Sequence, residues 1–208
     1  VVGAAVLALI FLYHERLDRP HSSVPVMTLV RRSLVAVART PLARGVFFTY
    51  LFLLLGQRLV LPFLALFVQG LHGEEALATY VGLVAGAYGL AAAIGSPGAG
   101  ALGDRIGYRQ VLWGALLLTS GCFLVAAFLP ELAGFAVDYA LIGVGVAGAT
   151  AMLFTLLATG LPDDIRSPVL NLALAPFYLS AIAGSLIATQ ILATTGGDLR
   201  PLWLLGAL

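Results

Sequence analysis

Two charged side chains interrupt long apolar stretches of this sequence, and they are its first candidates for chemistry. Arg58, preceded by Gln57, lies near the middle of one apolar run, and Asp138 lies about two turns into another. If such a run crosses a bilayer, a central arginine costs at least about 2.5–3.5 kcal/mol and should face the bundle interior or a water-filled cavity. We expect Arg58 to lie on a substrate or proton pathway or to form a structural ion pair. Asp138 could relay protons, pair with Arg58, or stay hydrated at the outer interface.

A proline, Pro62, and four polar residues add to this candidate pathway. Pro62 lacks an N–H group, so it removes the hydrogen bond to the carbonyl of Arg58 and should soften a helix there. Polar side chains that could line a cavity are Tyr88, Tyr139, Asn171 and Tyr178. Tyrosines are also common at membrane interfaces, and this interpretation stays open for them.

The remaining reactive residue types form no catalytic or metal-binding pattern. Cys122 is the single cysteine, and we expect it to be a small buried hydrophobe. The histidines, His14, His21 and His72, lack metal-ligand spacing. The stretch GVGVAG at 143–148 fits a dinucleotide fingerprint, but it lies inside a continuous apolar run and not between a strand and a helix. We therefore expect no metal, no cofactor and no enzymatic activity, and we interpret these glycines as a helix-packing face.

The elements that must position these residues are predicted to be membrane helices. Hydrophobic residues make up 61% of the chain and charged residues 10%, and the mean hydropathy is +1.03. Soluble domains carry about 25% charged residues. Five complete apolar runs cover 45–71, 76–102, 110–130, 132–160 and 168–194, and an incomplete one starts at Pro201. Most exceed the roughly 20 residues that a span needs, and none alternates as a membrane strand does. The predicted fold class is all-α membrane bundle.

The arginines are concentrated on one side of this predicted bundle. The chain has no lysine, and nine of its eleven arginines fall in alternate loops. These are Arg16, Arg19, Arg31, Arg32, Arg39 and Arg44 before the first complete run, Arg105 and Arg109 in the 103–109 loop, and Arg166 in the 161–167 loop. By the positive-inside rule this side is cytoplasmic. The formal net charge of +1 gives no bulk field for nucleic acid, so no nucleic-acid partner is expected.

Small residues recur every fourth position inside the apolar runs. The series are Gly82 and Gly86; Ala85, Gly89 and Ala93; Gly143, Ala147 and Ala151; and Ser180, Gly184 and Ala188. Such series let helix backbones approach each other closely. They indicate either static bundle packing or a face on which helices slide, and the sequence does not separate the two.

The stretch GALGDRIGYRQVL at 100–112 places three glycines between two apolar runs, where the chain must reverse within few residues. We expect Gly103 and Gly107 to supply the backbone freedom for that reversal. Gly100 would leave space where two helices converge.

The same stretch carries three charges next to these glycines. Asp104 is an acid at the membrane surface among arginines, and it is well placed to meet the positive end of a neighbouring helix. Arg105 and Arg109 can pair with Asp104 or with lipid phosphates. As a bare loop, the stretch could also serve only to end one span and begin the next.

As a pattern, the stretch resembles the signature loop of the major facilitator superfamily, G-x-L-A-D-R-x-G-R-K-x-x-L. The matching residues are Gly100, Leu102, Asp104, Arg105, Gly107 and Leu112. Gly103 replaces the alanine of the signature and Tyr108 its first basic residue, whereas Arg109 keeps the second. A long basic loop precedes the stretch. LPFLALFVQGL at 61–71 is similar to the end of a half's opening helix, and LPDDIRS at 161–167 is similar to a P-x-x-x-R-G loop. These features place the copy in the second half of such a protein.

The resemblance implies a six-helix half of a twelve-helix bundle, truncated at both ends. Residues 1–13 would be the end of the sixth transmembrane helix, 14–44 the central cytoplasmic loop, and 45–208 the C-terminal transmembrane bundle. Asp104 would engage the start of a helix in the first half and hold the cytoplasmic side shut. Such a charge–dipole contact contributes about 0.3–1 kcal/mol, which suits a reversible latch. The implied partners are the N-terminal half, the lipid bilayer, a small-molecule substrate and protons.

Within the superfamily, GDRIGYRQVL and LPFLALFVQ are most similar to bacterial drug:proton antiporters. This implies proton-driven export of hydrophobic or cationic compounds across the bacterial inner membrane by alternating access. Two features depart from that branch: Ser167 stands where a glycine usually follows the arginine, and GSLIAT at 184–189 stands where many relatives have G-P-x-x-G-G. The alternatives are a carrier for a sugar, an organic acid or an amino acid, and a membrane scaffold or sensor that does not transport.

Overall fold

The structure, a computed structural model, describes residues 26–208, so the predicted helix end at 1–13 and the first part of the predicted loop at 14–44 lie outside it. Within that range, five segments are long and apolar enough to cross a membrane. They are Pro41–His72, Leu77–Ile106, Tyr108–Ala126, Leu132–Gly160 and Ile165–Thr194. Each corresponds to one of the predicted apolar runs. The all-α membrane fold class is therefore confirmed.

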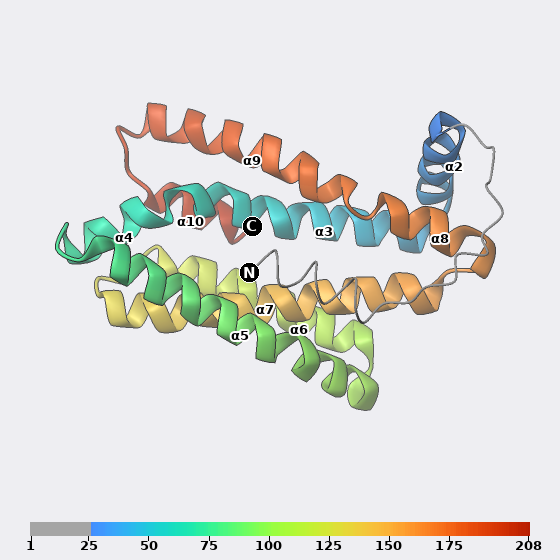
Figure 1. Ribbon diagram of the computed structural model, residues 1–208, viewed down its shortest axis with the longest axis horizontal. Coiled ribbons are helices and arrows are strands. Elements are labelled where there is room, and N and C mark those ends of the chain that lie inside the picture. The colour runs from blue at the N-terminus through green and yellow to red at the C-terminus, as the bar shows by residue number, and fades with distance from the viewer. Residues whose placement is uncertain (1–25) are drawn as a thin grey trace, which may run out of the picture.

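The described chain is a succession of helices joined by short turns. They are α2 (Val26–Arg39), α3 (Pro41–Val60), α4 (Leu64–His72), α5 (Leu77–Ile106), α6 (Tyr108–Ala126), α7 (Leu132–Gly160), α8 (Asp163–Leu172), α9 (Ala175–Thr194) and α10 (Arg200–Gly206). The 3₁₀ turn η1 (Leu61–Phe63) joins α3 to α4 within one span, and α8 continues into α9 in another. Figure 1 shows the spans running along the same axis, with α2 lying across one end.

Successive spans reverse at two opposite ends of the bundle. The α5–α6 turn, the α7–α8 turn and α2 share the end on the right of Figure 1. This end carries Arg105, Arg109 and Arg166, and we call it the arginine-rich end. The α4–α5, α6–α7 and α9–α10 turns share the opposite end. The alternation is the one that the positive-inside argument requires, while the cytoplasmic assignment itself stays a prediction.

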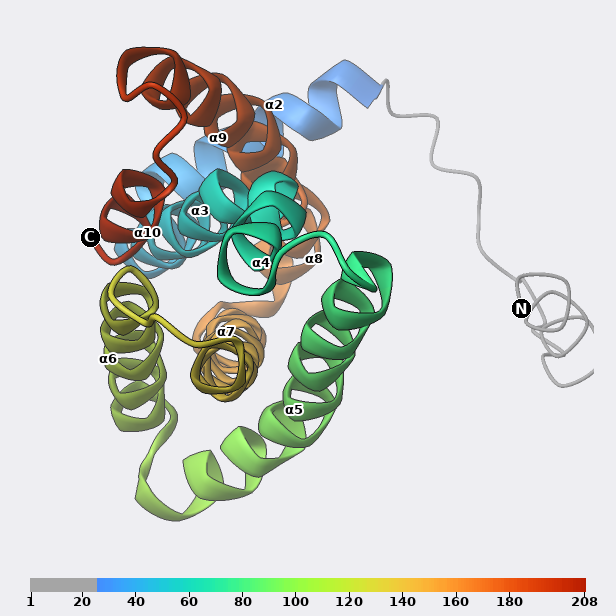
Figure 2. The same cartoon turned by 90° about the vertical axis from the view of Figure 1, so that its left-hand side faces the viewer.

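The helices pack around α7, which is the most buried span of the described chain. In Figure 2, α7 lies between α5 and α6, and α3 lies between α7 and α9. Aromatic side chains join the elements at the opposite end: Trp203 of α10 lies 5.1 Å from Phe67 of α4 and 5.3 Å from Phe135 of α7, between ring centroids. Aromatic pairs of this kind contribute about 0.5–1.5 kcal/mol each beyond their buried area. They anchor α10 to α4 and α7.

The predicted series of small residues have two different environments. On α7, a Cβ added at Gly143 would come within 2.6 Å of the Tyr88 carbonyl oxygen, and on α9 a Cβ at Gly184 would come within 2.6 Å of the Arg58 Cβ. These two series therefore serve close packing inside this half. On α5, a Cβ at Gly82, Gly86 or Gly89 would meet no atom within 4 Å. Together with the exposed Ala85 and Ala93, these three glycines form what we call the open face of α5.

Candidate functional site

The first span is interrupted in its middle, next to the predicted polar residues. α3 ends at Val60, η1 spans Leu61–Phe63, and α4 begins at Leu64. The interruption surrounds Pro62, whose ring nitrogen cannot donate to the Arg58 carbonyl. The span therefore contains a break of regular α-helix at Pro62, while the softening of the helix stays a prediction. Arg58 occupies the last turn of α3.

Gln57 and two tyrosines meet beside this break. The Gln57 side-chain amide of α3 donates a hydrogen bond to the Tyr88 hydroxyl of α5. The Tyr88 ring lies 5.0 Å from the Tyr139 ring of α7, between centroids. These three residues line a cavity of about 10 Å³, which is about the space that one water molecule needs. The structure thus brings three of the predicted site residues together, at the point where α3, α5 and α7 converge.

Arg58 points from α3 toward α9, away from this cluster. Its guanidinium carbon lies 4.5 Å from the centroid of the Phe177 ring, which is a cation–π contact. Such a contact stabilises by about 0.5 kcal/mol when exposed and by about 2 kcal/mol when desolvated. The close approach of Gly184 to the backbone of Arg58 allows α9 to lie against α3 at this level. Within residues 26–208 the ion pair found joins Asp163 and Arg166, so no acid of the described chain neutralises Arg58.

Asp138 lies on another side of the bundle, and the pairing with Arg58, one of the alternatives for this residue, is wrong. The Asp138 side chain of α7 is only 7% exposed, and the thiol of Cys122 on α6 neighbours it. Its Oδ2 atom is buried without a hydrogen-bond partner. The physical reason for the error is the direction of the side chains: Asp138 faces α6, whereas Arg58 faces α9. Cys122 is buried, as predicted.

Asn171 and Tyr178 do not join the central cluster. Asn171 of α8 lies near the arginine-rich end, where it lines a surface hollow of about 220 Å³ shared with α2. Tyr178 of α9 is 62% exposed, and its ring meets the Phe177 ring edge-on at 5.5 Å. Both side chains therefore border surfaces of this half and not its interior. Sequence reasoning missed Phe177, because a phenylalanine in an apolar span gives no signal that an arginine about 120 residues earlier covers its ring.

The signature stretch forms a turn that is shorter than predicted. α5 continues through Asp104 and Arg105 to Ile106, and α6 begins at Tyr108, so Gly107 alone separates the two helices. Gly107 has a φ of +100°, a conformation that suits glycine, and its predicted role is confirmed. Gly103 is different, because it is helical and buried. The prediction that Gly103 frees the backbone for the reversal is wrong.

Gly103 instead makes room for an aromatic ring. A Cβ at Gly103 would lie 2.6 Å from Cδ1 of Tyr108 and 3.1 Å from Sδ of Met152. The Tyr108 ring therefore packs directly on the glycine. Its hydroxyl donates a hydrogen bond of 2.7 Å to Oδ1 of Asp104, one turn earlier in the chain. The ring thus fixes the position of the exposed carboxylate, and this hydrogen bond takes the place of the ion pairs that we had considered with Arg105 or Arg109.

The other residues of the stretch lie around this turn. Leu102 is exposed and lines a groove between α5 and α6. A Cβ at Gly100 would meet no atom within 4 Å, so no neighbour in the described chain requires this glycine. Arg105 and Arg109 are exposed. Asp104 lies on the same side of α5 as its open face, because the 18 residues from Gly86 to Asp104 make five full turns at about 100° per residue.

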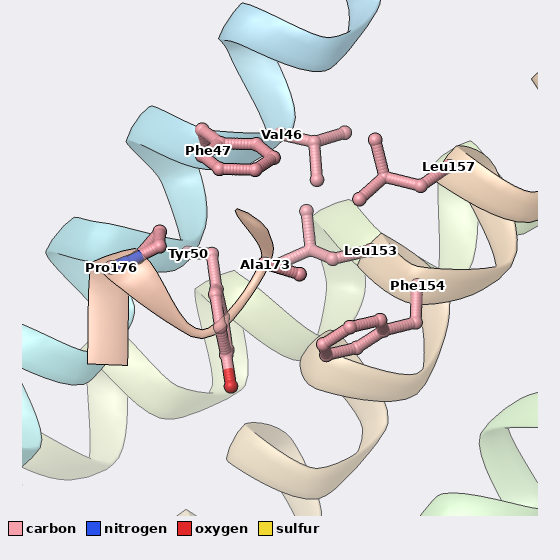
Figure 3. Close-up of a pocket in the computed structure, with 8 residues that line it drawn as sticks. All are labelled: Val46, Phe47, Tyr50, Leu153, Phe154, Leu157, Ala173 and Pro176. Atoms are coloured by element: carbon pink, nitrogen blue, oxygen red, sulfur yellow. The ribbon is translucent and has the colours of Figure 1, made fainter. Parts of the chain in front are cut away.

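The half is closely packed near the arginine-rich end. Figure 3 shows a pocket between α3, α7 and the junction of α8 with α9, where the Tyr50 ring stands between Pro176 and Phe154. The Tyr50 and Phe154 rings meet edge-on at 5.6 Å. The cavity that is left measures about 10 Å³ and is lined by carbon-rich side chains, among them Leu153 and Leu157.

Comparison with known proteins identifies relatives of this chain. Residues 46–208 match the family described as Major Facilitator Superfamily. An uncharacterized MFS-type transporter, YuxJ of Bacillus subtilis, is 31% identical over 132 residues, which is 64% of this chain and 34% of that protein. The multidrug resistance protein MdtG of Enterobacter lignolyticus is 26% identical over 79% of this chain and 40% of its own length. MdtG of Klebsiella pneumoniae is 25% identical over 93% of this chain and 48% of its own. The chain thus spans between a third and a half of the length of these relatives.

Proposed function

The chain belongs to the major facilitator superfamily, and on that premise we propose that it is the second half of a proton-driven exporter of hydrophobic or cationic compounds. The five apolar helices within residues 26–208 make it an integral, multi-pass membrane protein. Several relatives are named multidrug resistance proteins, which supports this substrate class over the sugar, organic-acid and amino-acid alternatives. The N-terminal half would complete the bundle, and the bacterial inner membrane, with the arginine-rich end in the cytoplasm, is the location that fits the arginine distribution.

The observation that carries the proposal is the polar cluster beside the break in the first span. Gln57, Tyr88 and Tyr139 place an amide and two hydroxyl groups at the level of the break after Val60, inside a largely apolar bundle. An apolar site with a few convergent polar groups is the usual form of a small-molecule site. A broken helix also gives a span two segments that can tilt relative to each other. Substrate would bind against this cluster, between the two halves.

Arg58 and Asp138 would provide the charges of the pathway. Arg58 is covered by Phe177 on one side and has no acid partner in the described half. We therefore expect Arg58 either to pair with a carboxylate of the first half or to face the substrate pathway. Asp138 has a buried Oδ2 atom without a hydrogen-bond partner. A carboxylate oxygen of this kind can take up and release a proton without breaking a hydrogen bond in this half. We therefore assign the proton to Asp138.

The Asp104 carboxylate would act as the latch between the halves. It lies on the side of α5 that carries the open face, and Tyr108 holds it in place. When a helix start of the first half meets this carboxylate, the attraction contributes about 0.3–1 kcal/mol. That energy is small enough for the contact to break and reform in each transport cycle, as alternating access requires.

Efflux from living cells tests the substrate class. The complete transporter would be expressed in bacteria that lack their own exporters, and the loss of a fluorescent hydrophobic cation would be followed with and without a protonophore. We expect rapid efflux that the protonophore stops. Gln57→Leu should slow efflux, whereas Gln69→Leu, in the same span but at its far end, should not. A correctly inserted protein that takes up metabolites but exports no dye would refute the drug-export proposal in favour of a metabolite carrier. Absence of any transport would favour the scaffold or sensor.

A further inference from the structure

A large apolar groove runs along the outside of the bundle between α5 and α6. It has a volume of about 470 Å³, and α7 forms its floor. Figure 2 shows the two helices diverging on either side of α7. Every residue that lines the groove is apolar except Gln110, which lies at its arginine-rich end. The groove is separate from the polar cluster at the break of the first span, and the proposed transport function does not use it.

Glycines, which have no side chain, create this hollow. Gly98 of α5 and Gly114 of α6 both line the groove, and a Cβ at either would meet no atom within 4 Å. In the floor, a Cβ at Gly145 would come within 2.3 Å of the Thr119 hydroxyl oxygen, so α7 lies as close to α6 as the backbones allow. The wall glycines therefore leave unfilled space above a rigid floor. A flexible ligand without polar groups can occupy that space and make van der Waals contacts with the groove walls.

The groove faces the membrane and not the other half. Consecutive residues of a helix differ by about 100° around its axis. On α5, the lining residues from Ile94 to Ile106 point on average about 160° away from the open face that carries Asp104. If Asp104 and the open face meet the first half, the groove lies on the far side of α5. Lipid is then the medium that reaches it.

The length of the groove corresponds to one lipid leaflet. Twelve helical steps separate Ile94 from Ile106, which is about 18 Å at 1.5 Å per residue. The hydrocarbon core of a bilayer is about 30 Å thick, so one leaflet measures about 15 Å. The groove therefore accommodates a single acyl chain that lies along the helices from the membrane surface to the midplane.

Positive charge lies where the headgroup of that lipid would be. Arg105 continues the groove side of α5 beyond Gly98 by two turns, and Arg109 directly precedes Gln110 at the start of α6. Both arginines are exposed, and neither forms an ion pair within residues 26–208. Trp113, one turn further along α6, is 58% exposed, as tryptophans at membrane interfaces are. We propose that the α5–α6 groove binds an acyl chain of an anionic phospholipid whose phosphate contacts Arg105 and Arg109.

Lipid binding to the complete transporter tests this site without any transport measurement, so its outcome is independent of the proposed export. Purified protein in detergent would be mixed with equal amounts of phosphatidylglycerol and phosphatidylcholine, and the retained lipids would be counted by native mass spectrometry. We expect a bound phosphatidylglycerol in preference to phosphatidylcholine. Arg105→Gln should reduce that preference about five-fold, the effect of one basic residue at an anionic surface.

Two variants fill the groove, and a third provides the matched control. Gly114→Leu and Gly98→Leu place a side chain in the open space from opposite walls, so each should remove the retained lipid. Gly121→Leu adds the same side chain to α6, where there is also no atom within 4 Å, but three residues beyond Leu118, the last residue of α6 that lines the groove. It should leave retention unchanged. If Gly98→Leu and Gly114→Leu retain as much lipid as Gly121→Leu does, the proposed site is wrong. Displacement of the lipid by the exported dye would overturn the lipid assignment, because the groove would then be a substrate site.

Discussion

Replacing Gly103 by alanine should weaken the Asp104 latch although it leaves every charge in place. The added methyl carbon would lie 2.6 Å from Cδ1 of Tyr108 and 3.1 Å from Sδ of Met152, whereas carbon atoms pack best at about 3.5–4.0 Å. The Tyr108 ring must move by about 1 Å to restore that separation. Its hydroxyl then loses the 2.7 Å hydrogen bond to Asp104. A hydrogen bond of this kind contributes about 1 kcal/mol, which is roughly a five-fold change in a population.

The population of the open state can be measured by the accessibility of a cysteine. A cysteine at the exposed Ala93, on the open face of α5, should react with a thiol reagent from the arginine-rich side only when the two halves separate there. The native Cys122 is buried and gives little background. Gly103→Ala and Tyr108→Phe should each raise the reaction rate about five-fold, because each removes the same hydrogen bond.

The double variant decides whether the reasoning is correct. Since both changes act on one contact, their effects should not add, and Gly103→Ala with Tyr108→Phe should react at the rate of Gly103→Ala alone. Gly98→Ala, another α5 glycine with no atom within 4 Å of its Cβ position, should react as the unchanged protein does. Additive effects of the two changes, or an unchanged rate in Gly103→Ala, would refute the role that we assign to Gly103 and Tyr108.

Three further predictions follow from the packing of the first span. Gly184→Ala should lower the free energy of unfolding of the purified protein by about 1–3 kcal/mol, because the added Cβ would lie 2.6 Å from the Cβ of Arg58. Gly45→Ala, whose Cβ would meet no atom within 4 Å, should leave the free energy of unfolding unchanged. Phe177→Leu should destabilise the protein by about 0.5–2 kcal/mol through the lost cation–π contact, and Phe177→Tyr should restore the stability; equal melting temperatures of the two variants would contradict that contact. Pro62→Ala should let the Arg58 carbonyl accept a hydrogen bond and join α3 to α4, which slows dye efflux without lowering stability; faster efflux would argue against the break as a moving part.

The spans and their interruption could be predicted from the sequence, because hydropathy and proline act locally. The five apolar runs and the break at Pro62 needed no knowledge of neighbouring helices. The ends of the helices were less accurate. α5 extends four residues past its predicted end at 102, and α6 ends at Ala126, before the predicted 130. The glycines and charges of the signature stretch indicated a loop, but one glycine at 107 is enough for the reversal when both helices continue to it.

The partners of the site residues could not be predicted, because they come from distant parts of the chain. Gln57 and Tyr88 were both candidates, but only the convergence of α3 and α5 joins them. Arg58 and Asp138 have opposite charges, and a sequence gives no information about the direction in which each helix presents them. In the structure they face α9 and α6. The role of Gly103 also depended on a ring that folds back from the next helix.

Transport driven by an imposed proton gradient is the most direct test of the proposed function. The complete transporter would be reconstituted into vesicles, a pH gradient would be applied, and accumulation of the fluorescent cation would be recorded. The unchanged protein and Glu75→Gln, which alters an exposed acid at the opposite end, should accumulate dye only while the gradient lasts. Asp138→Asn should still exchange dye across the membrane but should not respond to the gradient. Dye movement that ignores the gradient in the unchanged protein, or a full response in Asp138→Asn, would contradict the account.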